Sequence, residues 1–191
     1  MNEMLKEYLR ENETVRWEGK AKAFSTLDGK YGKRFLVRVL VAVLVAAGII
    51  AGHVASGTDP KMGLIALVVL AVIAIAAAPF LERMRLMKAR YWITDQRVIM
   101  LGSDKLMRSM DLDAIDAFKV VADGSAKNCL VLGSVVFKDA EKSMRWRAGT
   151  PKAPEDAGSS REHALGMILY NVENAGEAVA LLKTLGCAQV A

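Results

Sequence analysis

The chain has few of the residues from which enzymes build reactive sites. Its 191 residues include two cysteines and two histidines. His53 and His163 lie in separate regions, and neither stands in a recognisable Cys–His or Ser–His–Asp setting. Phosphate-binding loops, Gly-x-Gly-x-x-Gly patterns and zinc-ligand spacings are also missing from the sequence. We therefore expect a protein that is not an enzyme and holds no metal or other cofactor. An enzyme built on scattered carboxylates is the alternative.

Two long stretches contain no charged residue. They cover Val39–Ala55 and Met62–Leu81, and a short polar break separates them. The second run holds 20 residues, which as a helix would span about 30 Å, the thickness of a bilayer core. The runs predict a transmembrane helical hairpin over residues 35–81, and the alternative is a pair of buried core helices in a soluble protein. The first run begins too late in the chain for a cleavable signal peptide.

Basic residues gather at the two ends of this predicted hairpin, whereas the loop between the helices offers only Lys61. Because positive flanks stay inside, we expect a multi-pass cell-membrane protein with two spans and both termini in the cytoplasm. Cys129 and Cys187 would then be free thiols in a reducing compartment, with a disulfide as the alternative. The net charge of +5 points to a membrane surface rather than to nucleic acid. The expected membrane-surface contacts are Lys30, Lys33, Arg34, Arg38, Arg83, Arg85, Lys88 and Arg90.

Small residues recur along the first apolar run at Gly48, Gly52 and Ser56. Such a row lets another helix approach closely. We expect the partner to be the second helix of the same chain, through Ala66, Ala74 or Ala78. A second protomer is the alternative.

The N-terminal segment has the pattern of an amphipathic helix. Met1, Met4, Leu5, Tyr8 and Leu9 recur at the spacing of one helix face. We expect this face to pack on the soluble domain, and lying on lipid is the alternative.

After the second apolar run the pattern changes to short strands and turns. The chain closes with a helix, for which Asn174 and Glu177 form a predicted capping box and Gly186 a predicted end. Several short strands followed by one helix favour an antiparallel sheet that is curled or packed as a small barrel or sandwich. The expected strands are Tyr91–Thr94, Val98–Leu101, Leu106–Met110, Ala117–Val121, Leu130–Phe137, Ser143–Arg147 and Leu165–Val172.

Three segments resemble bacterial membrane proteins with a pleckstrin-homology-like (PH-like) domain, formerly a domain of unknown function. They are the hairpin Tyr91–Ile99, the stretch Glu13–Gly19 before the membrane and Asp111–Ile115. The resemblance implies a seven-strand curled sheet capped by a C-terminal helix. It divides the chain into an arm at 1–34, the transmembrane hairpin at 35–81 and a cytoplasmic PH-like domain at 82–191. The polar insertion Thr150–Ser160 departs from the family pattern, and we expect a mobile loop there.

Three arginines are candidates for contact with an anion or a partner. We expect Arg97 to tie down its hairpin through Asp95 or a backbone carbonyl, with a contact to a phosphate as the alternative. Arg145 and Arg147 would share one face of a strand, which we expect to be solvated, with a partner surface as the alternative. The sequence as a whole predicts an α+β membrane protein that recruits an unknown protein partner or forms a homo-oligomer. A lipid-headgroup sensor is the second reading.

Overall fold

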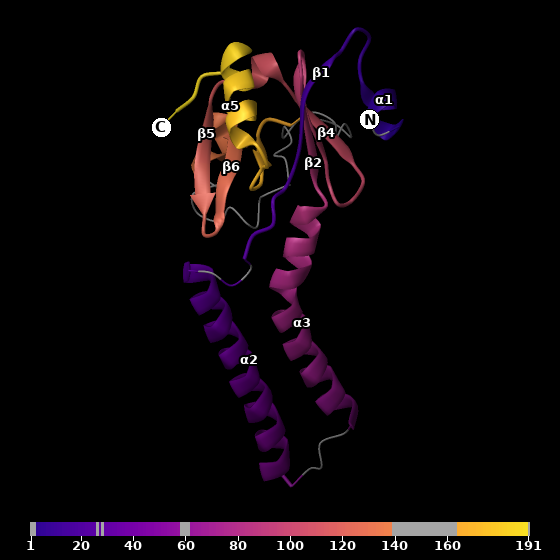
Figure 1. The fold of residues 1–191 in the computed structure, drawn as a ribbon. Helices are drawn as coiled ribbons and strands as arrows, with labels where there is room; N and C mark the ends of the chain where they lie inside the picture. The colour runs from indigo at the N-terminus through magenta and orange to yellow at the C-terminus, as the bar shows by residue number, and fades with distance from the viewer. Residues whose placement is uncertain (1–2, 26, 28, 58–61, 139–163, 191) are drawn as a thin grey trace. The chain divides into compact units, whose positions relative to one another are not determined.

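The computed structural model describes residues 3–25, 27, 29–57, 62–138 and 164–190 (Figure 1). The chain divides into two compact units. One is Ser25–Arg83, and the other combines Met1–Phe24 with Met84–Ala191. The segments before and after the long helices therefore belong to the same unit.

The first unit consists mainly of two long helices, α2 (Gly29–Ala55) and α3 (Met62–Met87). The last residues of α3, from Met84 onward, belong to the second unit. By length and composition both are apolar enough to cross a membrane, which confirms the prediction of two such helices. Many of their large apolar side chains are exposed, including Leu40 (59%), Leu44 (62%), Leu67 (66%) and Leu70 (64%). The alternative of two buried core helices is therefore wrong for this chain.

The second unit contains two antiparallel sheets. The first has the order β1-β2-β3-β4, and the second has the order β5-β6-β7. This arrangement, with its closing helix, is the α+β class expected from the sequence. The strands are β1 (Val15–Lys20), β2 (Arg90–Thr94), β3 (Arg97–Leu101), β4 (Met107–Asp111), β5 (Phe118–Asp123), β6 (Ala126–Leu132) and β7 (Met167–Leu169).

The strand predictions need correction in three places. The predicted strand Leu165–Val172 is shorter, because β7 covers only Met167–Leu169. The predicted strand Leu130–Phe137 ends at Leu132, because Gly133 has φ 85° and a 3₁₀ turn follows at Ser134–Val136. β1 was not predicted at all, although it pairs with β2 along its length. The predicted strand Ser143–Arg147 and the insertion Thr150–Ser160 lie outside the described residues.

The two sheets and the C-terminal helix α5 (Ala175–Thr184) enclose one apolar core. Trp17 and Tyr91 come from the first sheet, Phe118 and Leu130 from the second, and Leu182 from α5. Figure 1 shows α5 lying beside β5 and β6. The helix completes the enclosure that neither sheet provides alone.

The sheets are joined at one edge, where the segment after β1 meets the segment after β7. Ala21 and Val172 form an antiparallel bridge. The Lys22 N–H donates to the Asn171 carbonyl at 2.7 Å, and the Asn171 amide donates back to the Lys22 carbonyl at 2.9 Å. This join fixes the chain immediately before it leaves for α2.

The sequence predicted one end of α5 correctly and the other incorrectly. The capping box at Asn174 is wrong, because Asn174 has φ 55° and its side chain makes no capping hydrogen bond. Its backbone carbonyl instead accepts from Glu177 N–H at 3.0 Å. The predicted end at Gly186 is confirmed: φ is 90°, and its N–H donates to the Lys183 carbonyl at 3.1 Å.

The outer faces of both sheets are also covered. On the second sheet, Val131, Ile168 and Tyr170 pack with Phe24 and with Leu86 from the end of α3. The rings of Phe24 and Tyr170 meet edge to face, with centroids 4.9 Å apart. The residues that lead into α2 and out of α3 are therefore anchored on one surface of the unit.

The outer face of the first sheet carries the short helix α1 (Glu3–Tyr8). Leu5 is fully buried against Trp92 and Ile99, which pair across β2 and β3. A bulge between Val15 and Trp17 lets Val15 face this side while Trp17 faces the core. The predicted packing of the N-terminal helix on the soluble domain is confirmed at Leu5.

Candidate functional site

The most connected polar group in the second unit is the guanidinium of Arg97. The Arg97 side chain is 5% exposed, and the Glu13 side chain beside it is fully buried. Arg97 Nε donates to Glu13 Oε1 at 3.0 Å, and Nη2 donates to Glu13 Oε2 at 3.0 Å. The pair is bidentate, the strongest geometry open to an arginine and a carboxylate.

The remaining donors of Arg97 reach two other elements. Nη1 donates to Ser109 Oγ of β4 at 3.3 Å, and Nη2 donates to the carbonyl of Tyr8 at 2.6 Å. The guanidinium also lies 4.7 Å from the centre of the Tyr8 ring, close enough for a cation–π contact. Arg97 thus links β3, β4, the segment before β1 and the last residue of α1.

Thr94 positions this cluster at the β2–β3 turn. Its Oγ1 donates to Glu13 Oε1 at 2.7 Å and accepts from the Arg97 backbone N–H at 2.9 Å. Asp95 points elsewhere: its carboxylate accepts from Thr14 N–H at 3.0 Å and from Thr14 Oγ1 at 2.6 Å. The expected tie to a backbone carbonyl is found at Tyr8, whereas the expected Asp95–Arg97 contact is replaced by Glu13–Arg97.

Both carboxyls have lowered pKa values. Burial raises the pKa of the Glu13 carboxyl, but hydrogen bonds from Arg97, the Arg10 N–H and Thr94 outweigh burial and bring it below its ordinary value. Hydrogen bonds from the Thr14 side chain and backbone lower the pKa of Asp95. Glu13 is therefore a buried carboxylate at neutral pH, and it neutralises Arg97 within the fold.

This geometry leaves little room for an external anion at Arg97, because the guanidinium is buried and bonded to a carboxylate of the same chain. Arg145, Arg147 and His163 lie outside the described residues. Sequence reasoning missed Glu13, Thr94 and Ser109 as partners of Arg97. The alternation of Val15 and Trp17 with charged residues was the available signal for β1, which brings Glu13 to this place.

The predicted membrane-surface residues lie at the ends of α2 and α3 or just beyond α3. The side chains of Lys33, Arg34 and Arg38 are exposed, and Arg83 is half-buried. Arg85, Lys88 and Arg90 are exposed, and Arg90 lies 3.8 Å from the Glu18 carboxylate. The side chain of Lys30 is outside the described residues.

The small-residue row of α2 is not covered by α3, which corrects the expected packing within the chain. A Cβ added at Gly48 or Gly52 would meet no atom within 4 Å. Ser56 Oγ donates to the His53 carbonyl of its own helix at 2.8 Å. Ala66, Ala74 and Ala78 of α3 are exposed as well.

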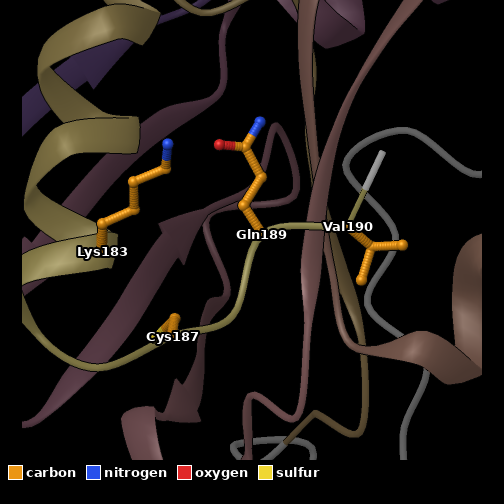
Figure 2. Close-up of a pocket in the computed structure, with 4 residues that line it drawn as sticks. All are labelled: Lys183, Cys187, Gln189 and Val190. Atoms are coloured by element: carbon orange, nitrogen blue, oxygen red, sulfur yellow. The ribbon is translucent and has the colours of Figure 1, made fainter.

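A shallow hollow of about 590 Å³ lies beside the C-terminal end of α5. It is lined by Lys183, Cys187, Gln189 and Val190, and Figure 2 shows the first three grouped around it while Val190 points another way. Burial raises the pKa of the Cys187 thiol, which reduces its thiolate fraction at neutral pH. Cys129 and Cys187 are both buried and free, as predicted.

Metal-ligating side chains do not gather in the described residues: no group of three His, Cys, Asp or Glu is placed to hold an ion there. Comparison of the chain with protein-family models, with curated proteins and with solved structures gives no match.

Proposed function

We propose that the chain is a membrane-anchored module whose PH-like domain stands at the cytoplasmic face and binds a protein partner. The observation that carries the proposal is the exposure of leucine and valine along α2 and α3. In water that much exposed apolar surface would be unfavourable, whereas lipid would cover it. Exposed Lys33, Arg34 and Arg85 at the helix ends fit anionic headgroups, at about 1 kcal/mol each.

The second unit supports the PH-like part of the proposal. The resemblance implies a seven-strand curled sheet capped by a C-terminal helix. The unit has a four-stranded and a three-stranded antiparallel sheet and a closing helix, which supports that likeness. The family leaves the ligand open, since one fold hosts many functions. Because Arg97 is bonded to Glu13, the buried polar cluster acts as a structural link. The partner therefore binds at the surface of the unit.

Self-association has one specific observation in its favour. The glycines of α2 face open space, and close approach of a second α2 at Gly48 and Gly52 would give both rows a partner. A homo-oligomer would bring several domains together at the membrane without excluding another partner. Lipid-headgroup sensing has no comparable observation beyond the basic flanks.

Photo-crosslinking in native membranes tests the function. A photoreactive residue placed at the exposed Leu106 or Leu165 of the full chain should give a defined adduct with one other protein or with a second copy. The same residue at the fully buried Leu130 is the matched control and should give none. Adducts with lipid alone from Leu106 and Leu165 would contradict protein recruitment and favour the headgroup sensor.

A further inference from the structure

The outer face of the first sheet binds a helix. We call it the α1-binding face and define it by Trp92, Ile99, Leu101 and Met107, with Arg97, Ser109 and Asp111 at one end. Cross-strand pairing sets Trp92 beside Ile99 and Leu101 beside Met107. Ile99 also pairs with Ser109, and Arg97 pairs with Asp111. The face is therefore apolar along most of its length and polar at one end.

The occupant of this face is a short helix. α1 has six residues, far fewer than an isolated helix needs to be stable in water. Leu5 is its one fully buried anchor among the described side chains, with Tyr8 and Leu9 partly buried beside it. α1 is held by this contact and by its short connection to β1, so it is helical only while it is docked.

Docked α1 leaves buried polar atoms without partners. Trp92 is 1% exposed, and its indole N–H has no acceptor in the described part of the chain. The Tyr8 hydroxyl is buried in the same cluster and likewise lacks a partner there. A buried donor without an acceptor destabilises the contact that buries it. An occupant that supplied an acceptor to Trp92 would therefore bind better than α1 does.

The face keeps its polar end when α1 leaves. Arg97 stays bonded to Glu13 and Ser109, neither of which belongs to α1, while its bond to the Tyr8 carbonyl and its contact with the Tyr8 ring open. That carbonyl ends a helix, and every helix exposes such carbonyls in its last turn. The salt bridge from Arg10 to Asp111 is partly exposed and adds little to docking. The free guanidinium donor could thus receive the end of another helix.

We propose that α1 is an exchangeable cover, and that the α1-binding face receives an amphipathic helix of the partner protein. That helix carries apolar side chains at i, i+3 and i+4, as Leu5, Tyr8 and Leu9 do, and a carboxylate or amide that accepts from the Trp92 indole. This inference rests on the proposed function, because it names the surface and the kind of partner. Docking of α1 would hold the site closed until a better-matched helix displaces it.

Exchange of α1 is tested with a fluorescent peptide that copies residues 1–10, added to the full chain in detergent micelles. Leu5→Ala should raise the affinity for this peptide at least tenfold over wild type, because the chain's own helix no longer competes. Lys6→Ala, at an exposed position on the same helix, is the matched control and should bind as wild type does. A chain that lacks residues 1–9 gives a second measurement if Leu5→Ala unfolds. If the peptide bound wild type, the Leu5→Ala chain and the chain that lacks residues 1–9 with equal affinity, the proposal would be overturned.

The acceptor is tested by replacing each peptide position in turn with glutamine. At least one glutamine peptide should bind the Leu5→Ala chain about tenfold more tightly than the parent peptide. The gain should vanish in a chain that carries Leu5→Ala together with Trp92→Phe, which has no indole N–H. A gain that persists in the double variant, or no gain at any position, would remove Trp92 from the proposed recognition.

Crosslinking in native membranes separates this inference from the proposed function. Loss of the partner adduct in Trp92→Phe, with the domain still folded, supports both. An adduct that Leu5→Ala and Trp92→Phe leave unchanged keeps the function and overturns this site. A homodimer adduct that Leu5→Ala abolishes makes the occupant a second copy's α1, because both copies then lack the Leu5 anchor, and it overturns the partner helix. Peptide exchange without any protein adduct overturns the function itself.

Discussion

At the scale of single residues, the contact that matters most is the bidentate bond between Arg97 and Glu13. Four segments meet at this pair. A buried ion pair is often no more stable than a matched apolar pair, but removal of one partner leaves a charge with no compensation. The value of the pair is therefore in fixing where the N-terminal segment lies.

Glu13→Gln should reduce the free energy of unfolding by about 3–5 kcal/mol, because it leaves the Arg97 charge buried without a carboxylate. Urea unfolding of the full chain in detergent, followed by tryptophan fluorescence, measures the change. The matched control is Glu18→Gln, since Glu18 and Arg90 form a half-exposed pair at 3.8 Å. That control should change stability by less than about 1 kcal/mol. Equal losses in both variants would contradict the assigned role of Glu13.

The Glu13 carboxylate also predicts that the free energy of unfolding falls in acid. Its folded pKa lies below its ordinary value, so its stabilising contribution is complete above the unfolded pKa. The contribution is lost as the pH falls from about 5 through the lowered pKa. Asp95 acts in the same direction, so the Glu13→Gln variant still loses some stability in acid through other groups. Urea midpoints measured from pH 7 to pH 3 should fall less steeply for Glu13→Gln than for wild type, and parallel curves would contradict this assignment.

At the scale of elements, strand β1 needs a glycine at position 19, because a larger residue there would collide with a core side chain. A Cβ at Gly19 would overlap the ring of Trp17, which is 8% exposed and packs in the main core. Gly19→Ala should therefore cost about 1–3 kcal/mol through overpacking. Gly176→Ala in α5 is the matched control, because its added Cβ would meet no atom within 4 Å and alanine favours a helix. The control should be neutral or slightly stabilising in the same unfolding assay, and a neutral Gly19→Ala would show that Trp17 lies elsewhere.

The elements also show what could be read from the sequence. β2, β3 and β4 were predicted within one or two residues because branched and aromatic side chains mark them. The two long helices were predicted because their runs lack charge. β1 was missed although Val15 and Trp17 alternate with charged residues, because its partner β2 follows it only after the two long helices.

The candidate site was harder to predict than the fold. Arg97 could be singled out from its hairpin, but Glu13 lies 84 positions away, and a single sequence does not show which residues meet across the chain. The turn geometry at Asn174 and Gly133 was missed for a related reason. Both residues have positive φ, so the backbone turns where side-chain patterns favoured a capping box and a longer strand.

At the scale of the whole molecule, the second unit is assembled from segments on both sides of the two long helices. Met1–Phe24 supplies β1 and α1, and Met84–Ala191 supplies the other strands and α5. A fragment that begins after α3 would lack one edge of the first sheet, so binding experiments need the full chain. The proposed arrangement also requires that both connections lie on the same side of a membrane.

Topology is tested by cysteine labelling in intact cells with a membrane-impermeant maleimide. Ser56→Cys, in the exposed segment after α2, should react from outside. Lys127→Cys, at an exposed position of β6, should react only after permeabilisation. Wild type is the control, because Cys129 and Cys187 are buried and should label little. The reverse pattern would invert the proposed orientation.

The central claim is that α2 and α3 lie in a lipid bilayer. Alkaline carbonate extraction of membranes tests it most directly, because carbonate releases proteins held by surface charge and leaves membrane-spanning ones behind. We expect the full chain to remain in the membrane pellet and to dissolve only when detergent is added. Recovery of the intact chain in the carbonate supernatant as a dissolved species would contradict the account.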